Sequence, residues 1–552
     1  MTFATVRDRY SQEEIERFYA DGSWRRETLF DMLEAQVAQR PEKVFITDDT
    51  RSLTYSELRD TALRLAVGMY RQGIRPGDRV CVQVPNWVEF AQIAVALSRL
   101  GAILVPIMPI YRMDEVSYIA SNSGARMIFT CATFKNFDYV EMYRKVRVES
   151  PDLGRIVVLR GGPEKDTTPY DSLFADVDPN DVADEIGPGV GPDDHFMIVY
   201  SSGTTSRPKG CLHTVNTMAG GARQLAKVFA YSDEDVQFGP SPITHTTGLV
   251  TSVLLPLIHG AGSHLMESWE PHAGLDHIRR WGCTTAVSAT TFLQMLMDAY
   301  DPEEHDASSL RLWVAAGAPI PGAFVERASE LLPDCRILSL YGRSENLTTT
   351  TCTVDDDPHR AATSDGRPLP GSSVKIVDEL GEEVPRGQEG DIAYRGPSHM
   401  LEYIGRPEET AELFTPDGYS RSGDLGVMDE DGYVRVTGRL KDIVIRGGMN
   451  ISVRQVEDLL AAHPAVDAVA VVGMPDPRLG ERICCYLVPH PGNESVTLEE
   501  LKDYLLGQGL AIQKVPERLE VVEELPMTAT GKIQKHVLRA DIVAKLENAG
   551  PS

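Results

Sequence analysis

Apolar positions in the first half of the chain follow two different periods. Leu29, Leu33 and Val37 have the spacing of one face of a helix. Thr54 and Glu57 form a capping-box pattern that predicts the start of a second helix. Short apolar runs of strand-like composition stand after such helical segments, at 80–84, 127–131, 156–159 and 196–200. Helices that alternate with buried strands indicate an α/β fold with largely parallel sheets.

The pattern changes twice toward the C-terminus. From about residue 366, short strand-like runs are broken by Gly, Pro and acidic turns, which predicts a small β-rich subdomain. A compact α+β segment follows the stretch "GRLKDIVIRGGMNIS". We expect Ser452 and Gln455 to cap one of its helices, and Thr497 and Glu500 to cap another.

The length of 552 residues exceeds what one simple core supports, so we expect at least two domains. The boundary is placed after residue 439, which gives a large N-terminal region over 1–439 and a C-terminal domain over 440–552. Within the larger region, the Gly-, Pro- and Asp-rich stretch 161–195 is interpreted as a surface connection between two α/β halves.

The composition is that of an ordinary globular protein, 42% hydrophobic and 24% charged, with a net charge of −27. An acidic surface argues against nucleic acid and anionic membranes as main partners, although a local cationic pocket can still hold an anionic ligand.

The most apolar long stretch, Phe90 to Tyr111, is interrupted by Gly101 and Pro106, which predicts a buried helix and a strand and no membrane span. The eight cysteines include no C-x-x-C pair, so neither a zinc site nor a disulfide framework is indicated. The N-terminus lacks the apolar core of a signal peptide, and we expect a cytoplasmic protein with reduced thiols.

The stretch "YSSGTTSRPKG" at 200–210 directly follows an apolar run, which predicts a strand that ends in a loop rich in hydroxyl groups and glycine. The N–H groups and hydroxyls of such a loop can donate hydrogen bonds to phosphate, and Lys209 can offset its charge. The loop is not a Walker P-loop, because G-x-x-x-x-G-K-[S/T] is absent and Pro208 precedes the lysine. Taken alone, the loop is better explained by a solvated Ser/Thr turn.

Six further motifs follow this loop, namely "SPITHTTG" (241–248), "AAGAPIP" (315–321), "YGRSE" (341–345), "SRSGDLG" (420–426), "GRLKDIVIRGGMN" (438–450) and "PMTATGKIQK" (526–535). In this order and at these spacings the seven motifs resemble the adenylate-forming superfamily of acyl-CoA synthetases, nonribosomal-peptide adenylation domains and luciferases. The chain looks most like bacterial cyclohexanecarboxylate-type or medium-chain carboxylic acid–CoA ligases. The resemblance implies two α/β subdomains and a β-subdomain, followed by a small mobile α+β C-terminal domain. It also implies an AMP-forming ligase that uses ATP, Mg²⁺ and coenzyme A.

The resemblance gives each candidate residue a role in the attack of a carboxylate on the α-phosphate of ATP. Because the reacting groups carry like charges, catalysis depends mainly on positioning and charge neutralisation. Lys532 would bridge the carboxylate and the α-phosphate, Ser344 would bond the α-phosphate, and Glu345 would bind Mg²⁺. The β- and γ-phosphates would be wrapped by Ser201, Ser202, Gly203, Thr204, Thr205 and Lys209. The nucleoside would be held by Tyr341, Gly317, Ala318 and Pro319 at adenine and by Asp424 and Arg439 at ribose.

In the second half-reaction the acyl group would pass to the thiol of coenzyme A after the C-terminal domain rotates. Lys441 stands two residues after Arg439 and matches the hinge position of the family. Gly447 and Gly448 would then lie beside the acyl group, where glycine lets pantetheine pass close to the backbone.

The resemblance places the acyl pocket, with His245 as a further catalytic candidate, near His245–Gly248, Ala289–Thr291, Ala315–Gly317 and Leu340–Gly342. Acetate-specific relatives carry tryptophan at the position of Gly342, so we expect glycine there to leave room for a longer acid. These segments offer no cation for a second carboxylate and no acidic group for an amine. We therefore expect an apolar, alicyclic or medium-chain, monocarboxylate.

Two alternatives stay open. The acyl-adenylate could be passed to an amine, as in amide synthetases, or the chain could be a catalytically inactive binding protein. The presence of Lys532, Glu345 and Asp424 argues against an inactive protein. The identity of the acid and the oligomeric state are left open.

Overall fold

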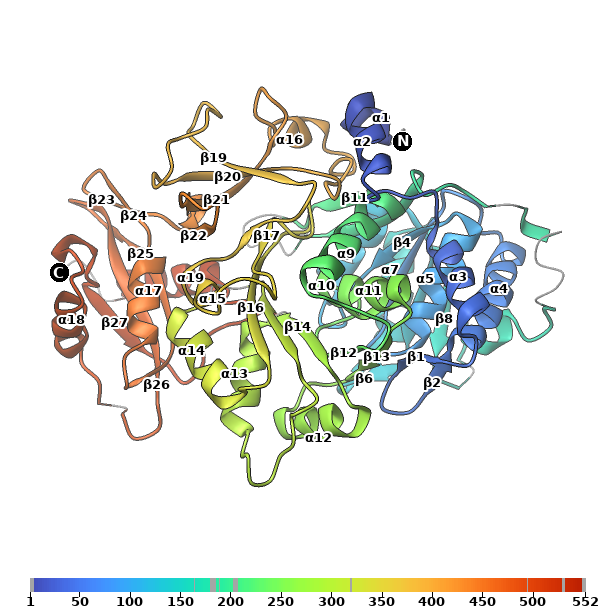
Figure 1. Ribbon diagram of the computed structural model, residues 1–552, viewed down its shortest axis with the longest axis horizontal. Coiled ribbons are helices and arrows are strands. Elements are labelled where there is room, and N and C mark those ends of the chain that lie inside the picture. The colour runs from blue at the N-terminus through green and yellow to red at the C-terminus, as the bar shows by residue number, and fades with distance from the viewer. Residues whose placement is uncertain are drawn as a thin grey trace.

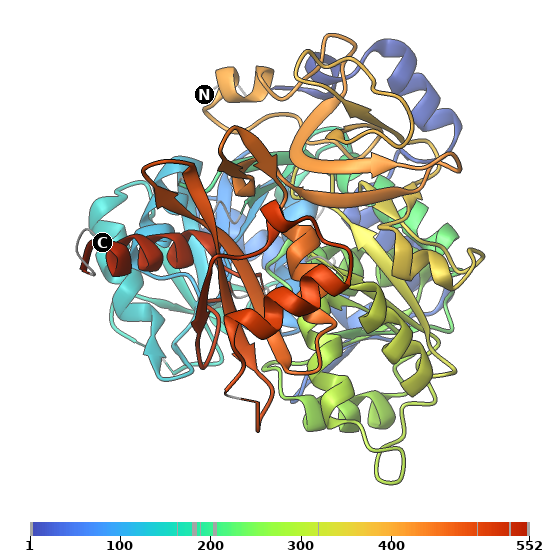
Figure 2. The same cartoon turned by 90° about the vertical axis from the view of Figure 1, so that its left-hand side faces the viewer.

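The computed structural model describes residues 4–162, 164–178, 185–187, 189–201, 207–317, 320–493, 495–528 and 532–548. Two large sheets form the body of the molecule, and the C-terminal sheet stands at the opposite end of the long axis from the N-terminal helices α3 and α4 (Figure 1). A turn of 90° brings the C-terminal sheet and its helices in front of the larger body (Figure 2).

One large sheet has seven strands among the described residues, in the order β11-β10-β4-β3-β5-β8-β9. The strands are β3 (Arg79–Gln83), β4 (Ile103–Pro106), β5 (Ala125–Cys131), β8 (Arg155–Leu159), β9 (Thr168–Pro169), β10 (His195–Tyr200) and β11 (Gly210–Thr214). The central strands pair in parallel and are almost wholly buried, which is why their sequences are continuous apolar runs. Because β8 and β10 belong to the same sheet, the interpretation of 161–195 as a connection between two halves is wrong. Tyr170 and Leu173 within that stretch are buried against the sheet.

The other large sheet has nine strands in the described chain, in the order β18-β17-β16-β15-β14-β12-β13-β1-β2. The strands are β1 (Val44–Thr47), β2 (Ser52–Thr54), β12 (Val236–Gly239), β13 (Gly262–Leu265), β14 (Thr285–Ala289), β15 (Leu312–Ala316), β16 (Arg336–Tyr341), β17 (Thr350–Thr351) and β18 (Arg367–Pro368). From β1 through β16 the neighbouring strands are parallel, as predicted. A short hairpin, β6 (Thr133–Phe134) with β7 (Phe137–Asp138), stands apart from both sheets.

Helices cover both large sheets. The helices before the C-terminal domain are α1 (Val6–Arg9), α2 (Gln12–Ala20), α3 (Leu29–Gln39), α4 (Tyr55–Arg71), α5 (Glu89–Leu100), α6 (Met113–Ser123), α7 (Tyr139–Glu149), α9 (Val215–Val228), α10 (Thr246–Leu249), α11 (Leu255–His259), α12 (Pro271–Trp281), α13 (Thr290–Ala299), α14 (Gly322–Leu331), α15 (His359–Thr363) and α16 (Pro407–Ala411). A π-helical turn, Val250–Leu254, joins α10 to α11, and a 3₁₀ helix spans Tyr170–Leu173. The capping box of Thr54 and Glu57 at α4 is confirmed.

The β-rich subdomain is an antiparallel sheet of β19 (Ser373–Val377), β20 (Gly390–Arg395), β21 (Ser420–Met428) and β22 (Val434–Arg439). The C-terminal sheet follows, with β23 (Val444–Arg446), β24 (Met449–Ile451), β25 (Val466–Asp476), β26 (Gly480–Pro489) and β27 (Arg518–Val521). Its helices are α17 (Arg454–Ala461), α18 (Leu498–Gly507) and α19 (Lys535–Asn548), with 3₁₀ turns at Leu440–Asp442 and Ile512–Lys514.

Successive side chains along β25 point to opposite faces of the C-terminal sheet, and helices pack on both faces. Val471 packs with the residues of α17 and α18, whereas Val472 packs with Leu538 and Ile542 of α19. The capping box of Thr497 and Glu500 is confirmed. The predicted cap by Ser452 is wrong, because α17 begins after Val453 and the Ser452 hydroxyl donates to the carbonyl oxygen of Thr437 instead.

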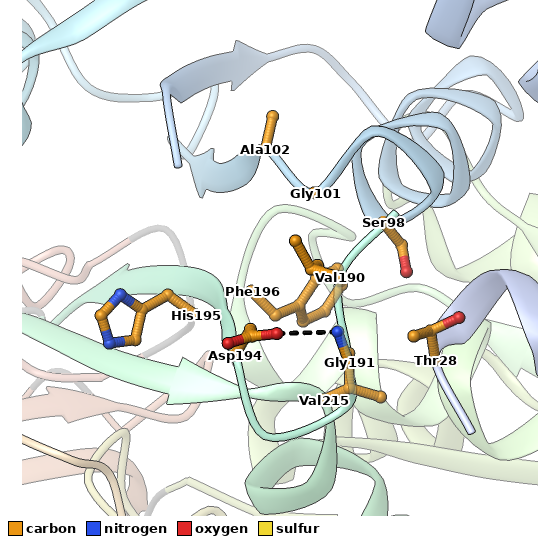
Figure 3. A pocket seen from close by; sticks show the side chains of 10 residues that line it. All are labelled: Thr28, Ser98, Gly101, Ala102, Val190, Gly191, Asp194, His195, Phe196 and Val215. Carbon is orange, nitrogen blue, oxygen red and sulfur yellow. Dashed lines mark hydrogen bonds between the residues drawn. The ribbon is translucent and has the colours of Figure 1, made fainter. Parts of the chain in front are cut away.

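A small cavity lies where the segment before β10 packs against the end of α5 (Figure 3). The Asp194 carboxylate accepts a hydrogen bond from the N–H of Gly191 at 2.7 Å and holds this segment. Gly101 ends α5 with φ +78, and a Cβ there would lie 2.6 Å from Cγ1 of Val190. With a volume of about 10 Å³, the cavity has room for one water molecule at most and is no substrate site.

Candidate active site

Three of the predicted pocket segments stand at one edge of the nine-stranded sheet, where β14, β15 and β16 end. Parallel pairing sets Ala289 beside Ala316, and Ala316 beside Leu340. The fourth segment begins α10 after His245, and α10 packs against β14. The fold therefore brings all four segments to the carboxyl edge of a parallel sheet, where α/β proteins commonly bind ligands.

The loop between β10 and β11 is closed by two hydrogen bonds between Ser201 and Lys209. The N–H of Ser201 donates to the carbonyl oxygen of Lys209 at 2.9 Å, and the N–H of Lys209 donates to the Ser201 hydroxyl at 3.3 Å. Nζ of Lys209 forms an ion pair with Glu409 and lies 4.9 Å above the ring of Tyr403. Six of the predicted residues lie outside the described parts of the chain, namely Ser202, Gly203, Thr204, Thr205, Ala318 and Pro319.

Asp424 is 5% exposed and is bonded by two residues that were predicted to hold the nucleoside. The hydroxyl of Tyr341 donates to Oδ2 at 2.6 Å, and Nε of Arg439 donates to Oδ1 at 2.6 Å. Burial and the carboxylate raise the pKa of Tyr341 well above its ordinary value, so the phenol stays a donor. Attraction to Asp424 raises the pKa of Arg439. Because a carboxylate offers about four acceptor positions, Asp424 can accept two more hydrogen bonds.

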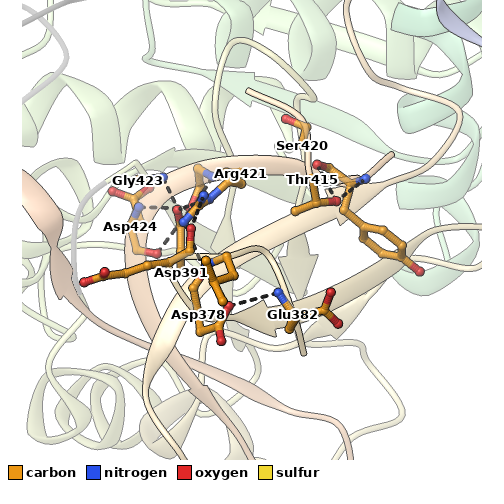
Figure 4. A network of polar contacts seen from close by, with 12 residues as sticks. Asp378, Glu382, Asp391, Thr415, Ser420, Arg421, Gly423 and Asp424 are labelled. Carbon is orange, nitrogen blue, oxygen red and sulfur yellow. Dashed lines mark hydrogen bonds and ion pairs between the residues drawn. The ribbon is translucent and has the colours of Figure 1, made fainter. Parts of the chain in front are cut away.

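Asp391 on β20 holds the turn that carries Asp424 (Figure 4). Its Oδ1 accepts from the N–H groups of Ser422 at 3.2 Å and Gly423 at 2.9 Å. Its Oδ2 pairs with Nε of Arg421 at 3.2 Å. Asp391 was not predicted, because it stands 31 residues before Ser422 and outside every motif.

The turn after β16 is held at Ser344 and Glu345 by three residues from two other segments. Nε2 of His213 lies 2.9 Å from the carbonyl oxygen of Ser344. The N–H of Met400 donates to the carbonyl oxygen of Glu345 at 2.7 Å. The hydroxyl of Tyr403 donates to Oε1 of Glu345 at 2.5 Å. Burial lowers the pKa of His213 to about 4, so its ring is neutral near pH 7.

Arg343 was also missed, although it stands inside the quoted "YGRSE" motif. Its Nε donates to the side-chain oxygen of Asn346 at 2.9 Å, within the same turn. Its terminal nitrogens donate to the carbonyl oxygens of Arg421 at 2.7 Å and Ser420 at 3.1 Å. Arg343 therefore ties the turn that bears Glu345 to β21.

Lys532 reaches this site from the C-terminal domain. A Cβ built on Gly317 would lie 3.6 Å from Cε of Lys532, which is ordinary van der Waals contact. Burial lowers the pKa of Lys532, and the charge of Arg439 lowers it further, whereas Asp424 and Glu345 act in the opposite direction. Candidates from both domains thus meet in one place.

His245 stands at the start of α10, where its Nδ1 accepts a hydrogen bond from the N–H of Thr247 at 3.3 Å. Burial and the nearby charge of Lys532 lower the pKa of His245 to about 3. The imidazole is therefore neutral near pH 7 and is a weak base.

The structure does not bring the predicted coenzyme A residues to Lys532. Gly447 and Gly448 form the turn between β23 and β24, with φ of +58 and +82, and both are exposed. Lys441 lies in the 3₁₀ turn just before β23. Arg539 of α19 donates to the carbonyl oxygen of Lys441 at 3.2 Å and to Asp442 at 2.6 Å.

Gly342 does not leave the free space that was expected. A Cβ at this position would lie 1.8 Å from the carbonyl oxygen of Leu347 and 3.2 Å from Cα of Thr348. Leu347 itself has φ +60, an uncommon value for a residue with a side chain. The expectation that Gly342 enlarges the acyl pocket is therefore wrong, because glycine is needed there for the tight turn that carries Ser344 and Glu345.

Within the described part of the chain, no helix combines the length and the apolar character that a bilayer crossing requires.

Comparison with known proteins gives two matches to family models, both described as parts of AMP-binding enzymes. Residues 33–404 match the model of the AMP-binding enzyme, and residues 455–532 match that of its C-terminal domain. The chain is 33% identical over 539 residues to the medium-chain fatty-acid–CoA ligase of Escherichia coli K12, covering 97% of this chain and 94% of that protein.

The fold is shared over most of the chain with solved structures, including the following two. The anthranilate–CoA ligase AuaEII in complex with anthranoyl-AMP superimposes with a TM-score of 0.86 at 27% identity, covering 95% of this chain and 98% of that one. The amide bond synthetase McbA of Marinactinospora thermotolerans gives a TM-score of 0.82 at 26% identity, covering 93% of this chain and all of that one. The chain therefore belongs to the AMP-binding enzyme family, the adenylate-forming ligases that include the acyl-CoA synthetases.

Proposed function

We propose that the protein is an ATP-dependent carboxylic acid–CoA ligase. It would form an acyl-adenylate first and an acyl-CoA thioester second, from an apolar monocarboxylate of medium size. The observation that carries the proposal is the position of Lys532, whose Cε lies 3.6 Å from where a Cβ on Gly317 would stand and whose charge interacts with Glu345 and Asp424.

In the first half-reaction, Lys532 and the hydroxyl of Ser344 would stabilise the negative charge at the α-phosphate. A preorganised cation is most effective in a site of low dielectric constant, such as the half-buried surroundings of Lys532. Glu345 would hold Mg²⁺, which offsets phosphate charge when bound, and its carboxylate is of the oxygen-ligand type that Mg²⁺ prefers. The Tyr403 hydroxyl orients that carboxylate.

The nucleotide would be held on both sides of the turn at Asp424. The acceptor positions that Tyr341 and Arg439 leave on Asp424 suit the two ribose hydroxyls. Lys209, together with the hydroxyl-rich loop 201–205, would bind the β- and γ-phosphates. His245, an uncharged imidazole at the start of α10, would line the acyl pocket.

The second half-reaction requires a different arrangement of the domains, because Gly447 and Gly448 lie on the surface. We place the domain boundary between Arg439 and Leu440, with Lys441 as the hinge. Rotation there would withdraw Lys532 and bring the two glycines to the acyl-adenylate. It would also require the bonds from Arg539 to Lys441 and Asp442 to rearrange.

The likeness to the medium-chain fatty-acid–CoA ligase supports an apolar acid and coenzyme A as acceptor. The likeness to an amide bond synthetase favours an amine acceptor as the second candidate. Both candidates share the acyl-adenylate and differ only in the step that follows.

The test measures ATP–pyrophosphate exchange over a panel of straight-chain, alicyclic, aromatic, amino and dicarboxylic acids. The proposal predicts the fastest exchange with an apolar acid larger than acetate, and consumption of free coenzyme A thiol with that acid. A fastest exchange with an amino acid or a dicarboxylic acid would contradict the substrate class. Product formed with amines and not with coenzyme A would favour the amide synthetase.

A further inference from the structure

A group of three potential metal ligands lies outside the proposed active site, on the side of the nine-stranded sheet formed by β1 and β13. It consists of Asp49 after β1, His264 in β13 and His277 in α12, with all three ligand atoms within 4.8 Å of one another. This group was not predicted from the sequence, because Asp49 stands far from the two histidines in the chain and the three residues follow no spacing motif.

The separations between the ligand atoms suit one small ion. Nε2 of His264 lies 2.8 Å from Nδ1 of His277, and Nδ1 of His277 lies 3.6 Å from Oδ1 of Asp49. Bonds of 2.0–2.1 Å in a tetrahedral arrangement would separate ligand atoms by about 3.3 Å. The two distances bracket this value, so small side-chain shifts would complete a three-ligand site.

The surroundings of His264 resemble the outer shell of a metal-binding histidine. The Thr47 hydroxyl lies 2.7 Å from Nδ1 of His264, which leaves Nε2 directed at His277. The ring of Trp281 is stacked on the His264 imidazole, with centroids 4.9 Å apart and planes at 19°. The orientation of His264 is therefore fixed before any ion binds.

The position of Asp49 is fixed by its buried neighbour in sequence. Oδ1 of Asp48 accepts hydrogen bonds from the N–H groups of Thr50 at 2.8 Å and Arg51 at 2.9 Å, and Oδ2 pairs with Arg160. A turn held in this way presents the Asp49 carboxylate toward α12. The Asp49 side chain is 36% exposed and that of His277 is 21% exposed, so an ion in solution can reach them.

We propose that Asp49, His264 and His277 bind a divalent transition-metal ion of the zinc class. Two imidazoles and one carboxylate match the ligand preference of Zn²⁺ and Co²⁺, and a water molecule would take the fourth position. The ion would link β1, β13 and α12, and it is independent of the Mg²⁺ assigned to Glu345. Without a metal, the same geometry is a hydrogen bond between His264 and His277. The experiment distinguishes a metal site from such a hydrogen bond.

The experiment uses the full chain without a polyhistidine tag, stripped with a chelator and titrated with Co²⁺ in the absence of ATP. We expect one equivalent to bind with the visible absorption of tetrahedral Co²⁺, and Zn²⁺ to displace it. His277→Ala and Asp49→Asn should each weaken binding by about tenfold or more. His272→Ala, an exposed histidine on the same helix, and Glu345→Gln should leave the Co²⁺ spectrum unchanged.

Equal Co²⁺ affinity of His277→Ala and the unaltered protein would overturn the proposal, as would the absence of a tetrahedral spectrum at saturating Co²⁺. Unfolding curves of the metal-free proteins serve as the folding control. Because the Asp49 side chain is the more exposed of the two variant sites, Asp49→Asn tests the site even if His277→Ala is unstable.

Discussion

Nζ of Lys209 lies 2.5 Å from Oε2 of Glu409, so the lysine assigned to the phosphates is already paired with a carboxylate. The two side chains are 30% and 36% exposed, and ion pairs of such exposure contribute about 0.2–1 kcal/mol. ATP must displace Glu409 to reach Lys209. Glu409→Gln should therefore lower the KM for ATP by up to about fivefold. Glu408→Gln, on the same short helix and exposed, is the matched control. A higher KM in Glu409→Gln would show that the carboxylate helps to bind ATP.

Gly342 is predicted to tolerate no side chain. In Gly342→Ala the new Cβ would overlap the carbonyl oxygen of Leu347, and overpacking of this kind costs about 1–3 kcal/mol or more. We expect a lower midpoint in urea unfolding and loss of adenylation, because the same turn carries Ser344 and Glu345. Gly162→Ala, where a Cβ meets nothing within 4 Å, should match the unaltered protein. A Gly342→Ala protein with unchanged stability and adenylation would refute this explanation of the glycine.

Capping boxes could be predicted from the sequence because both partners lie within one turn. Thr54 with Glu57 and Thr497 with Glu500 form as expected. The predicted cap at Ser452 does not form, because the partner of its hydroxyl is not local. The hydroxyl donates to a carbonyl oxygen on β22, 15 residues earlier. Short sequence patterns predict hydrogen bonds between residues that are close in the chain. They do not predict a competing hydrogen-bond partner on another strand.

In the candidate site, too, residues within the motifs could be predicted from the sequence, whereas the residues that support them could not. The motifs located Asp424, Tyr341, Arg439 and Lys532, and the structure brings these residues together. The supporting side chains were not found, because Tyr403 stands 58 residues from Glu345 and belongs to no motif. Their roles arise from contacts between segments far apart in the chain, and the spacing of residues along the sequence does not predict such contacts.

Stability should fall in mild acid because of buried neutral histidines. Burial lowers the pKa of His213 to about 4, whereas an unfolded histidine titrates near 6.5. Between these values the unfolded chain binds more protons than the folded one, so the free energy of unfolding decreases as the pH falls from 6.5 toward 4. Each such group contributes up to about 1.4 kcal/mol per pH unit. His213→Gln should reduce this slope in urea unfolding measured across that range, and an identical slope would exclude His213 as a contributor.

The hinge assignment predicts a selective defect in the second half-reaction. Lys441→Pro fixes φ and removes the N–H donor at the position where we place the rotation. Pyrophosphate release in a single turnover should stay near that of the unaltered enzyme, while thioester formation is lost. Lys441→Ala keeps a flexible backbone and should retain both steps. Equal loss of both steps in a folded Lys441→Pro protein would contradict the hinge role.

The central claim is that Lys532 acts on the α-phosphate while the acyl-adenylate forms and has no part in thioester formation. The direct test compares Lys532→Ala with the unaltered enzyme in two assays, ATP–pyrophosphate exchange and thioester formation from a supplied acyl-adenylate. The structure predicts a loss of about 10²–10³-fold or more in exchange, because a preorganised cation is removed from the reacting phosphate. Thioester formation should stay within about twofold, a difference of less than 0.5 kcal/mol. An equal decrease in both assays would contradict the claim.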